Sequence, residues 1–165
     1  MSAAQAAATE KRFCTFFLGE ECYGIDILTV REINRHVQLT PARGAPAAVR
    51  GFLNLRGQIV TVIDPAIQLG YRKREVLPTS RLVILKTNGD LARLGLSELT
   101  TADELAGLWI DRISDVISVA PDQITPAPPD QSGVNDHLIS AIVQRNEQVI
   151  RLVEPNALLR HGAAG

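Results

Sequence analysis

Hydrophobic positions along this chain fall in short runs that alternate with polar positions. Runs at 13–18 and 23–27 are aromatic and β-branched and are separated by a Gly-Glu-Glu turn, which is the signal of a β-hairpin. Further runs at 49–57, 58–63 and 81–86 are punctuated by glycine, proline or polar residues. Because helical periodicity is never sustained, the pattern predicts a mostly β protein whose strands close into small barrels.

Short helical turns are expected where a β-branched run ends in an acidic residue and proline, as at Asp64-Pro65 and Glu154-Pro155. An acidic N-cap followed by proline suits the first turn of a helix, and Gly70 suits the end of the first one. Residues 101–104 have the spacing of a capping box, which predicts another short helix there.

The same β pattern occurs twice. Segment 24–33 aligns with 107–116, glycine on glycine and apolar on apolar residue. Segment 58–69 aligns with 148–159, and in both a β-branched run precedes an acidic residue and proline. Chance similarity between apolar strands is the alternative for either block alone. Two blocks in the same order favour a duplication and predict two similar lobes.

The repeat also sets the expected organisation of the chain. A single domain is expected at 13–159, with a polar, disordered tail at 1–12 and a second tail at 160–165. Its expected parts are a first barrel at about 13–75, a second barrel at about 80–159 and an insertion at 88–106 within the second copy.

The net charge of −1 gives no general reason to expect nucleic-acid or membrane binding. Residues 1–76 carry ten lysines or arginines against seven acids, and residues 77–165 carry seven against eleven. Opposite charges on two lobes would favour head-to-tail association, and ordinary surface unevenness is the alternative. Neither a signal-peptide pattern nor a run of about 18 apolar residues occurs, so a soluble cytoplasmic protein is expected.

Patterns of catalytic or metal-binding residues are scarce. The sequence contains no Gly-rich phosphate loop and no Gly-x-Ser-x-Gly turn. His36, His137 and His161 stand singly in loops or the tail, without the spacing that a metal site needs. Asp64 and Glu154 could be compared with paired catalytic acids, but capping of the following turn explains both better. The sequence therefore predicts a protein with no enzymatic activity, metal or cofactor.

Cysteine and tryptophan positions point to a buried core. In the first hairpin Cys14 shares a face with Phe16 and Leu18, whereas Cys22 lies on the opposite face, so two free thiols are expected. Trp109 lies in an alternating apolar run and is expected in the core.

One arginine is a candidate for binding a partner. Arg56 lies in the sequence Asn-Leu-Arg-Gly at 54–57, a setting suited to paired hydrogen bonds at a protein interface. An internal bridge to Glu32 or Asp64 is the alternative, and both stay open. Residues 30–33, Val-Arg-Glu-Ile, would place apolar and charged side chains on the rim of a groove.

Several motifs together resemble one family. They are Phe-x-Leu-Gly-x-x-x-Tyr-Gly-Ile-Asp-Ile at 16–27, Val-x-Glu-Ile at 30–33, Gly-x-x-Asn-Leu-Arg-Gly at 51–57, Ile-Val-x-Val-Ile-Asp at 59–64, and Gly-x-x-x-Asp-x-Ile-Ser-Asp-Val at 107–116. This series closely resembles the CheW coupling proteins of bacterial chemosensory systems. The resemblance implies two small five-stranded Src-homology-3-like barrels without catalytic activity.

The resemblance also implies partners. Proteins of this family couple the hairpin tips of methyl-accepting chemoreceptors to the regulatory domain of a histidine kinase, which has the same fold. They alternate with that domain in rings, so self-association in rings is a further expectation. A cytoplasmic chain of this kind would be recruited to membrane-associated receptor arrays without inserting into the membrane. A small-ligand sensor that uses the groove between the lobes is the alternative function.

By resemblance, a partner-binding groove would involve Ile27, Val30, Glu32, Ile33 and Arg56, with Arg50 and Ile59 nearby. The insertion at 88–106 departs from the tight connection usual in the family. Its spaced leucines would pack on the second barrel or meet a specialised partner. Adaptors of non-flagellar pathways, such as surface sensing, twitching or second-messenger control, vary at such places.

Overall fold

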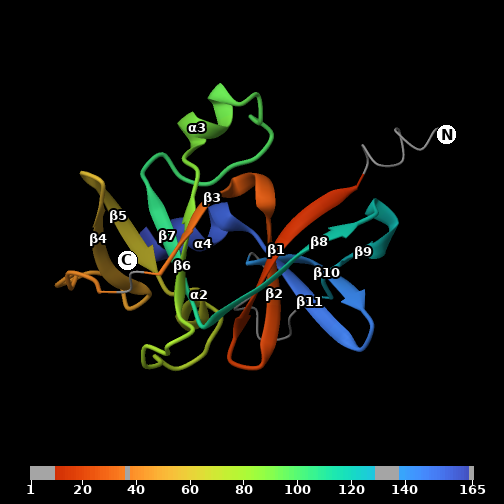
Figure 1. Cartoon of the computed structure of the whole chain (residues 1–165), viewed down its shortest axis with the longest axis horizontal. Helices are drawn as coiled ribbons and strands as arrows, with labels where there is room; N and C mark the ends of the chain where they lie inside the picture. Colours follow the sequence, from red (N-terminus) through yellow and green to blue (C-terminus); the bar gives the residue numbers. More distant parts are fainter. Residues whose placement is uncertain (1–9, 36–37, 129–137, 164–165) are drawn as a thin grey trace.

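Two curled β-sheets lie side by side and dominate the structure (Figure 1). The computed structural model describes residues 10–35, 38–128 and 138–163, without the side chains of 161–163. The predictions for His36, His137 and the side chain of His161 therefore lie outside the described residues. The mostly β fold with two small barrels is confirmed.

The first sheet has six strands, in the order β8 (Arg112–Val119), β1 (Lys11–Leu18), β2 (Glu21–Asp26), β11 (Gln148–Val153), β10 (Ile139–Arg145) and β9 (Ile124–Pro126). The second has five, in the order β3 (Val30–Asn34), β6 (Arg81–Leu85), β7 (Ala106–Ile110), β5 (Gln58–Ile63) and β4 (Val49–Leu55). Among the described strands, the β2–β11 and β5–β7 pairs are parallel and the other pairs are antiparallel. The helical elements are η1 (Ile27–Thr29), α2 (Pro65–Gln68), α3 (Asn88–Arg93), η2 (Pro121–Gln123) and α4 (Pro155–Ala163).

The two copies of the repeat exchange their first hairpins. The β1–β2 hairpin begins the first copy but pairs with β8 and β11 of the second. Strands β6 and β7 begin the second copy but pair with β3 and β5 of the first. The expected barrels at 13–75 and 80–159 are thus corrected: one sheet joins 11–26 to 112–153, and the other lies within 30–110. Alternation along a strand identifies its faces but not its hydrogen-bonded neighbours, so the exchange was not predictable from it.

Strand register supports the alignment of the two copies. Gly24 in β2 pairs with Leu152, and Gly107 in β7 pairs with Val62, which is the residue equivalent to Leu152. A Cβ atom at Gly24 would lie 3.0 Å from the Leu152 side chain, and one at Gly107 would lie 2.9 Å from the side chain of Ile84. Both glycines are therefore sites where neighbouring side chains pack directly on the backbone.

Three apolar clusters form the core. The central cluster lies between the sheets and helices and contains Phe16, Leu85, Leu108, Ile110 and Leu158. The other two belong one to each sheet: Phe13, Cys22, Ile117, Ile150 and Leu152 in the first, and Leu55, Val60, Leu82, Ile84 and Trp109 in the second. Cys14 is in the central cluster and both thiols are free, which agrees with the predicted opposite faces.

Local elements follow the sequence with some differences. The Asp64 side chain accepts a hydrogen bond from the N–H of Ala66 at 3.0 Å and caps α2, as predicted. The helix predicted at 101–104 is wrong, because the Thr101 hydroxyl donates to the carbonyl of Lys86 instead of capping a turn. The capping box of the insertion is formed earlier, at the start of α3, by Thr87 with the third helical residue.

Both expected tails contain regular structure next to the core. Strand β1 begins at Lys11, inside the predicted tail at 1–12, and α4 continues to Ala163, beyond the predicted boundary at 160.

Candidate functional site

Apolar candidate residues lie where the chain passes from the first sheet to the second. Asp26 caps η1, and its carboxylate accepts a hydrogen bond from the N–H of Leu28 at 3.0 Å. Ile27 and Val30 then pack against the central cluster, while Ile33 on β3 is 40% exposed. The crossing therefore presents an apolar edge beside the junction of the two lobes.

The sequence Asn-Leu-Arg-Gly forms the tip of the β4–β5 hairpin. Leu55 pairs with Gln58, so Arg56 and Gly57 form a two-residue loop with φ values of 52° and 85°. Positive φ at both positions is the signature of a type I′ turn. The Asn54 side chain accepts a hydrogen bond from the N–H of Gly57 at 3.0 Å. Asparagine and glycine thus build the turn, and the arginine side chain is left for another role.

Arg56 forms an ion pair with a second candidate residue. Its Nη2 lies 2.8 Å from Oε2 of Glu32 on β3, so of the two internal bridges considered, this one forms. The Arg56 side chain is nevertheless 66% exposed. The other oxygen of Glu32 is buried and has no hydrogen-bond partner among the described residues. An exposed pair of this kind contributes about 1 kcal/mol or less to folding, so the guanidinium can rearrange toward a partner.

Arg50 does not join these exposed residues. Its Nε lies 3.0 Å from Oδ2 of Asp64, and its Nη2 donates to the carbonyl of Arg74 at 2.7 Å. The guanidinium carbon lies 4.3 Å from the ring centroid of Trp109, and only 10% of the Arg50 side chain is exposed. The structure therefore gives Arg50 internal contacts and separates it from the other predicted site residues.

Four exposed apolar side chains form two equivalent pairs. Ile59 on β5 is 60% exposed, and its equivalent Val149 on β11 is 37% exposed. Ile33 on β3 is matched by Val116 on β8, which is 46% exposed. Sequence reasoning missed Val116 and Val149, although the repeat alignment pairs both with residues that it had selected. Each lobe therefore presents one exposed apolar residue on an edge strand, β3 or β8, and one on an interior strand, β5 or β11.

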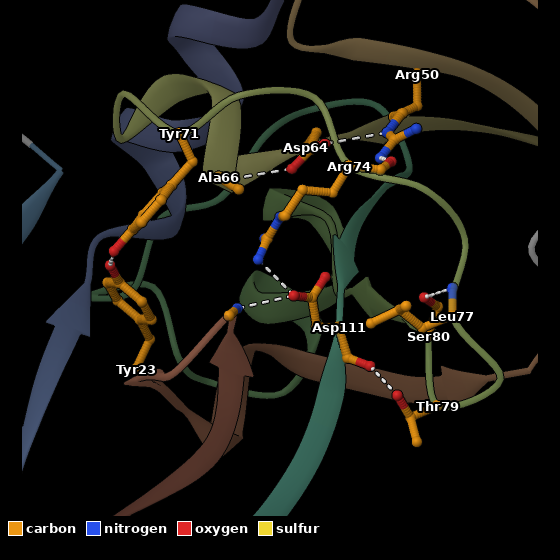
Figure 2. Close-up of polar contacts among 11 residues, drawn as sticks. Tyr23, Arg50, Asp64, Ala66, Tyr71, Arg74, Leu77, Thr79, Ser80 and Asp111 are labelled. Atoms are coloured by element: carbon orange, nitrogen blue, oxygen red, sulfur yellow. Dashed lines mark hydrogen bonds and ion pairs between the residues drawn. The ribbon is translucent and has the colours of Figure 1, made fainter.

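A buried carboxylate fastens the joining segment, residues 71–80, which connects the two copies (Figure 2). Oδ2 of Asp111 accepts a hydrogen bond from the N–H of Gly19 at 2.7 Å and forms an ion pair with Arg74. The Thr79 hydroxyl donates to the Asp111 carbonyl at 2.7 Å. Asp111 was not predicted as a key residue. The one indication in the sequence is that the repeat alignment places this acidic residue at the position of the apolar Leu28.

The same joining segment is held at a second point. The hydroxyl groups of Tyr23 and Tyr71 point toward each other (Figure 2) and link β2 of the first sheet to the start of the segment by a hydrogen bond of 2.8 Å. Burial raises the pKa of Tyr23 well above its usual value, with the Tyr71 hydrogen bond adding to the shift. These polar groups are structural, because they hold the two lobes in one arrangement.

Open depressions lie between the lobes and the insertion. Two adjoining ones, of about 220 and 300 Å³, share Lys11, Asp26, Glu98 and Leu99 in their lining. Within the described part of the chain, no group of three histidine, cysteine or acidic residues could hold a metal ion. Among the described helices, none has the length and apolar content to cross a membrane.

Comparison with known proteins places these features in one family. Residues 12–163 match the CheW-like domain. The chain belongs to the CheW family. The CheW chemotaxis proteins of Klebsiella aerogenes and Treponema pallidum are 30% and 32% identical to it. These matches cover 90% and 87% of this chain and 81% and 79% of the two relatives.

A solved structure of a CheW protein has the same fold. The scaffolding protein TtCheW from Thermoanaerobacter tengcongensis superposes with a TM-score of 0.73 at 29% identity, covering 87% of this chain and 88% of its own. As a CheW-family member the chain is a chemotaxis scaffold and not an enzyme, which confirms the resemblance seen in its motifs.

Proposed function

We propose that this CheW-family scaffold couples chemoreceptor hairpin tips to the regulatory domain of a chemotaxis-type histidine kinase by binding alone. The observation that carries the proposal is the exposed Arg56 at the tip of the β4–β5 hairpin, paired with Glu32 on β3, the strand that also carries the exposed Ile33. Arginine at a positive φ costs about 1 kcal/mol relative to asparagine or glycine, so the side chain has a use that outweighs turn geometry. An arginine with an apolar neighbour is a frequent centre of a protein interface.

Receptor contact is assigned to the edge formed by Ile27, Val30, Glu32, Ile33 and Arg56. Ile59 extends this surface along the outside of β5, and Arg50 supports the fold behind it through Asp64. A receptor tip is helical, and an amphipathic helix binds an apolar strip flanked by charge.

Kinase contact and ring self-association are assigned to the exposed apolar residues at equivalent positions of the two lobes. Val116 and Val149 on one lobe match Ile33 and Ile59 on the other, so a partner with the same fold could use equivalent surfaces. The distribution of charge supports contact between unlike lobes. Residues 30–110, which contain the second sheet, carry eleven lysines or arginines and seven acids. The rest of the chain carries six lysines or arginines and eleven acids. A balance of +4 on one lobe and −5 on the remainder favours end-to-end contacts.

Recruitment to membrane-associated arrays would follow from receptor binding. For the output we favour a non-flagellar pathway, because the insertion at 88–106 gives this chain a surface element that a minimal adaptor does not need. Deletion of the gene should then impair surface motility or second-messenger levels while swimming continues. Loss of swimming alone would instead assign the protein to a flagellar pathway.

Direct binding tests the central proposal. Titration calorimetry with the cognate kinase regulatory domain and with a receptor hairpin fragment should show binding to both at micromolar concentration. Absence of binding to either partner would overturn the proposal. Arg56→Asn should weaken receptor binding about tenfold while preserving the turn, because asparagine readily adopts a positive φ.

A further inference from the structure

The insertion in the second copy is a firmly anchored element. Thr87 caps α3, and the N–H of Asn88 donates to the carbonyl of Ala102 at 2.8 Å. Leu91 of α3 is fully buried, and the Asn156 side chain of α4 donates to the Thr101 carbonyl at 3.1 Å. The expectation that the insertion packs on the fold therefore holds for this half of it.

The end of α3 is different, because it turns an apolar side chain outward. Leu94 follows the helix and is 59% exposed, whereas Leu91, one turn earlier, is fully buried. Leu28 on η1 is 45% exposed. The Lys86 ammonium group donates to the Leu28 carbonyl at 2.8 Å and so joins the insertion to η1. Two exposed leucines on a fixed framework are suited to contact with a partner.

Positive charge surrounds Leu94. A depression of about 250 Å³ is lined by Arg31, Lys86, Asp90, Arg93 and Leu94; these residues together with Leu28 are called the α3 platform. Asp90 is its single acid, and it already pairs with Arg93. The hydrogen bond from the Thr87 N–H, with Arg93 and Arg31 nearby, lowers the pKa of Asp90. Three cations against one carboxylate leave the platform with a net positive charge.

We infer that the α3 platform docks an α-helix of a partner protein whose apolar stripe is flanked by acidic residues. Leucine side chains would pack against the stripe, and the cations would pair with the acids on either side. Arg31 and Lys86 form no ion pair within the described residues, and the Lys86 ammonium group keeps two N–H donors besides the one bound to the Leu28 carbonyl, so each can pair with an acid of the partner.

The platform continues the receptor-facing edge. Leu28 follows Ile27, and Arg31 lies between Val30 and Glu32, so the two surfaces adjoin along the chain. The inference therefore rests on the proposed function and deepens it: the insertion selects receptors whose helices carry acidic residues beside the tip. An anionic lipid surface is the competing occupant, but two exposed leucines offer little area for burial in a bilayer.

Binding of a receptor hairpin fragment to the full chain tests the inference. Arg31→Glu combined with Lys86→Glu should weaken binding about tenfold at low salt, and the loss should shrink as salt rises. Arg72→Glu combined with Lys73→Glu is the matched control, because both residues are exposed in the joining segment and the charge change is identical. Leu94→Ser removes an exposed side chain without risk to folding and should weaken binding about threefold.

Each outcome decides a different point. Wild-type binding that the platform variants leave unchanged overturns the inference and spares the proposed function. Absence of binding by the wild-type protein overturns the proposed function and, with it, the inference that a receptor helix docks on the α3 platform. If the variants lose only binding to vesicles of phosphatidylglycerol and phosphatidylcholine while hairpin binding persists, the surface is a lipid site and the inference is overturned.

Discussion

Arg56 and Asn146 have nearly the same backbone φ, 52° and 56°, at the tips of equivalent hairpins. Arg56 lies between β4 and β5, and Asn146 lies between β10 and β11. Asparagine is among the residues that tolerate this conformation best, so the second copy has the residue that suits the turn. The first copy has an arginine at the same place, and this difference marks where the two lobes diverge in use.

Arg56→Asn should therefore separate binding from stability. The substitution removes the ion pair with Glu32 but relieves the turn, so the free energy of unfolding should change by less than about 1 kcal/mol. Urea denaturation measures this, with the receptor-binding assay in parallel. A loss of several kcal/mol would show that the Glu32 bridge is a structural requirement of the fold.

Asp111→Asn should weaken the attachment of the joining segment. Asparagine can still accept the hydrogen bond from Gly19, but the ion pair with Arg74 is lost, and the expected cost is about 2 kcal/mol. Asp115→Asn is the matched control, because that side chain is exposed on β8 and should change stability by less than about 0.5 kcal/mol. Equal midpoints of urea denaturation for the two variants would contradict the role of Asp111.

Gly51→Ala should be among the most destabilising small substitutions. Gly51 has a φ of 150°, and an added Cβ would lie 2.3 Å from the Thr40 carbonyl oxygen, a backbone atom that cannot easily move. The expected loss is about 3 kcal/mol or more. Gly44→Ala is the control, since Gly44 also has a positive φ but open space around it, and should lose about 1 kcal/mol. Thermal unfolding should rank wild type, Gly44→Ala and Gly51→Ala in that order of decreasing stability.

The stability of the protein should depend on pH through Asp64. Burial raises the pKa of this carboxyl, and the Arg50 ion pair and the Ala66 N–H only partly oppose the shift. The folded state then holds the proton to higher pH than the unfolded state does. The stabilisation of the folded state by protonated Asp64 is therefore fully present below the ordinary carboxyl pKa. It is lost as the pH rises through the raised pKa of Asp64 in the folded state.

Urea midpoints measured upward from about pH 4, near the ordinary carboxyl value, check this expectation. Wild type should lose stability with rising pH more steeply than Asp64→Asn, whose side chain does not titrate. Parallel pH profiles for the two proteins would rule out the assigned shift.

The repeat alignment was the most informative part of the sequence. It matched Gly24 with Gly107, and both pair with equivalent residues of β11 and β5. The exchange of hairpins could not be predicted from the alignment, because the alternation of apolar residues identifies the faces of a strand but not its neighbours in a sheet.

Two local errors have specific physical causes. Arg50 was expected near the partner surface, but a buried Asp64 and the Trp109 ring provide it with an internal site that no local pattern reveals. The helix of the insertion was placed too late, because Gly89 in its first turn conceals the capping pair of Thr87 and Asp90. The spacing of residues does not show which carboxylate an arginine will pair with. It also does not show which of two possible N-caps, Thr87 or Thr101, begins a helix.

The hairpin exchange has a consequence for how such a protein can come apart. One copy of the repeat lacks the strands that its own first hairpin needs, so a chain cut to one copy would be complete only after a second molecule donated its hairpin. Fusing two copies through 71–80 makes that exchange intramolecular. A pairing of strands that would otherwise need two molecules then takes place within one chain, so the formation of both sheets is independent of dilution.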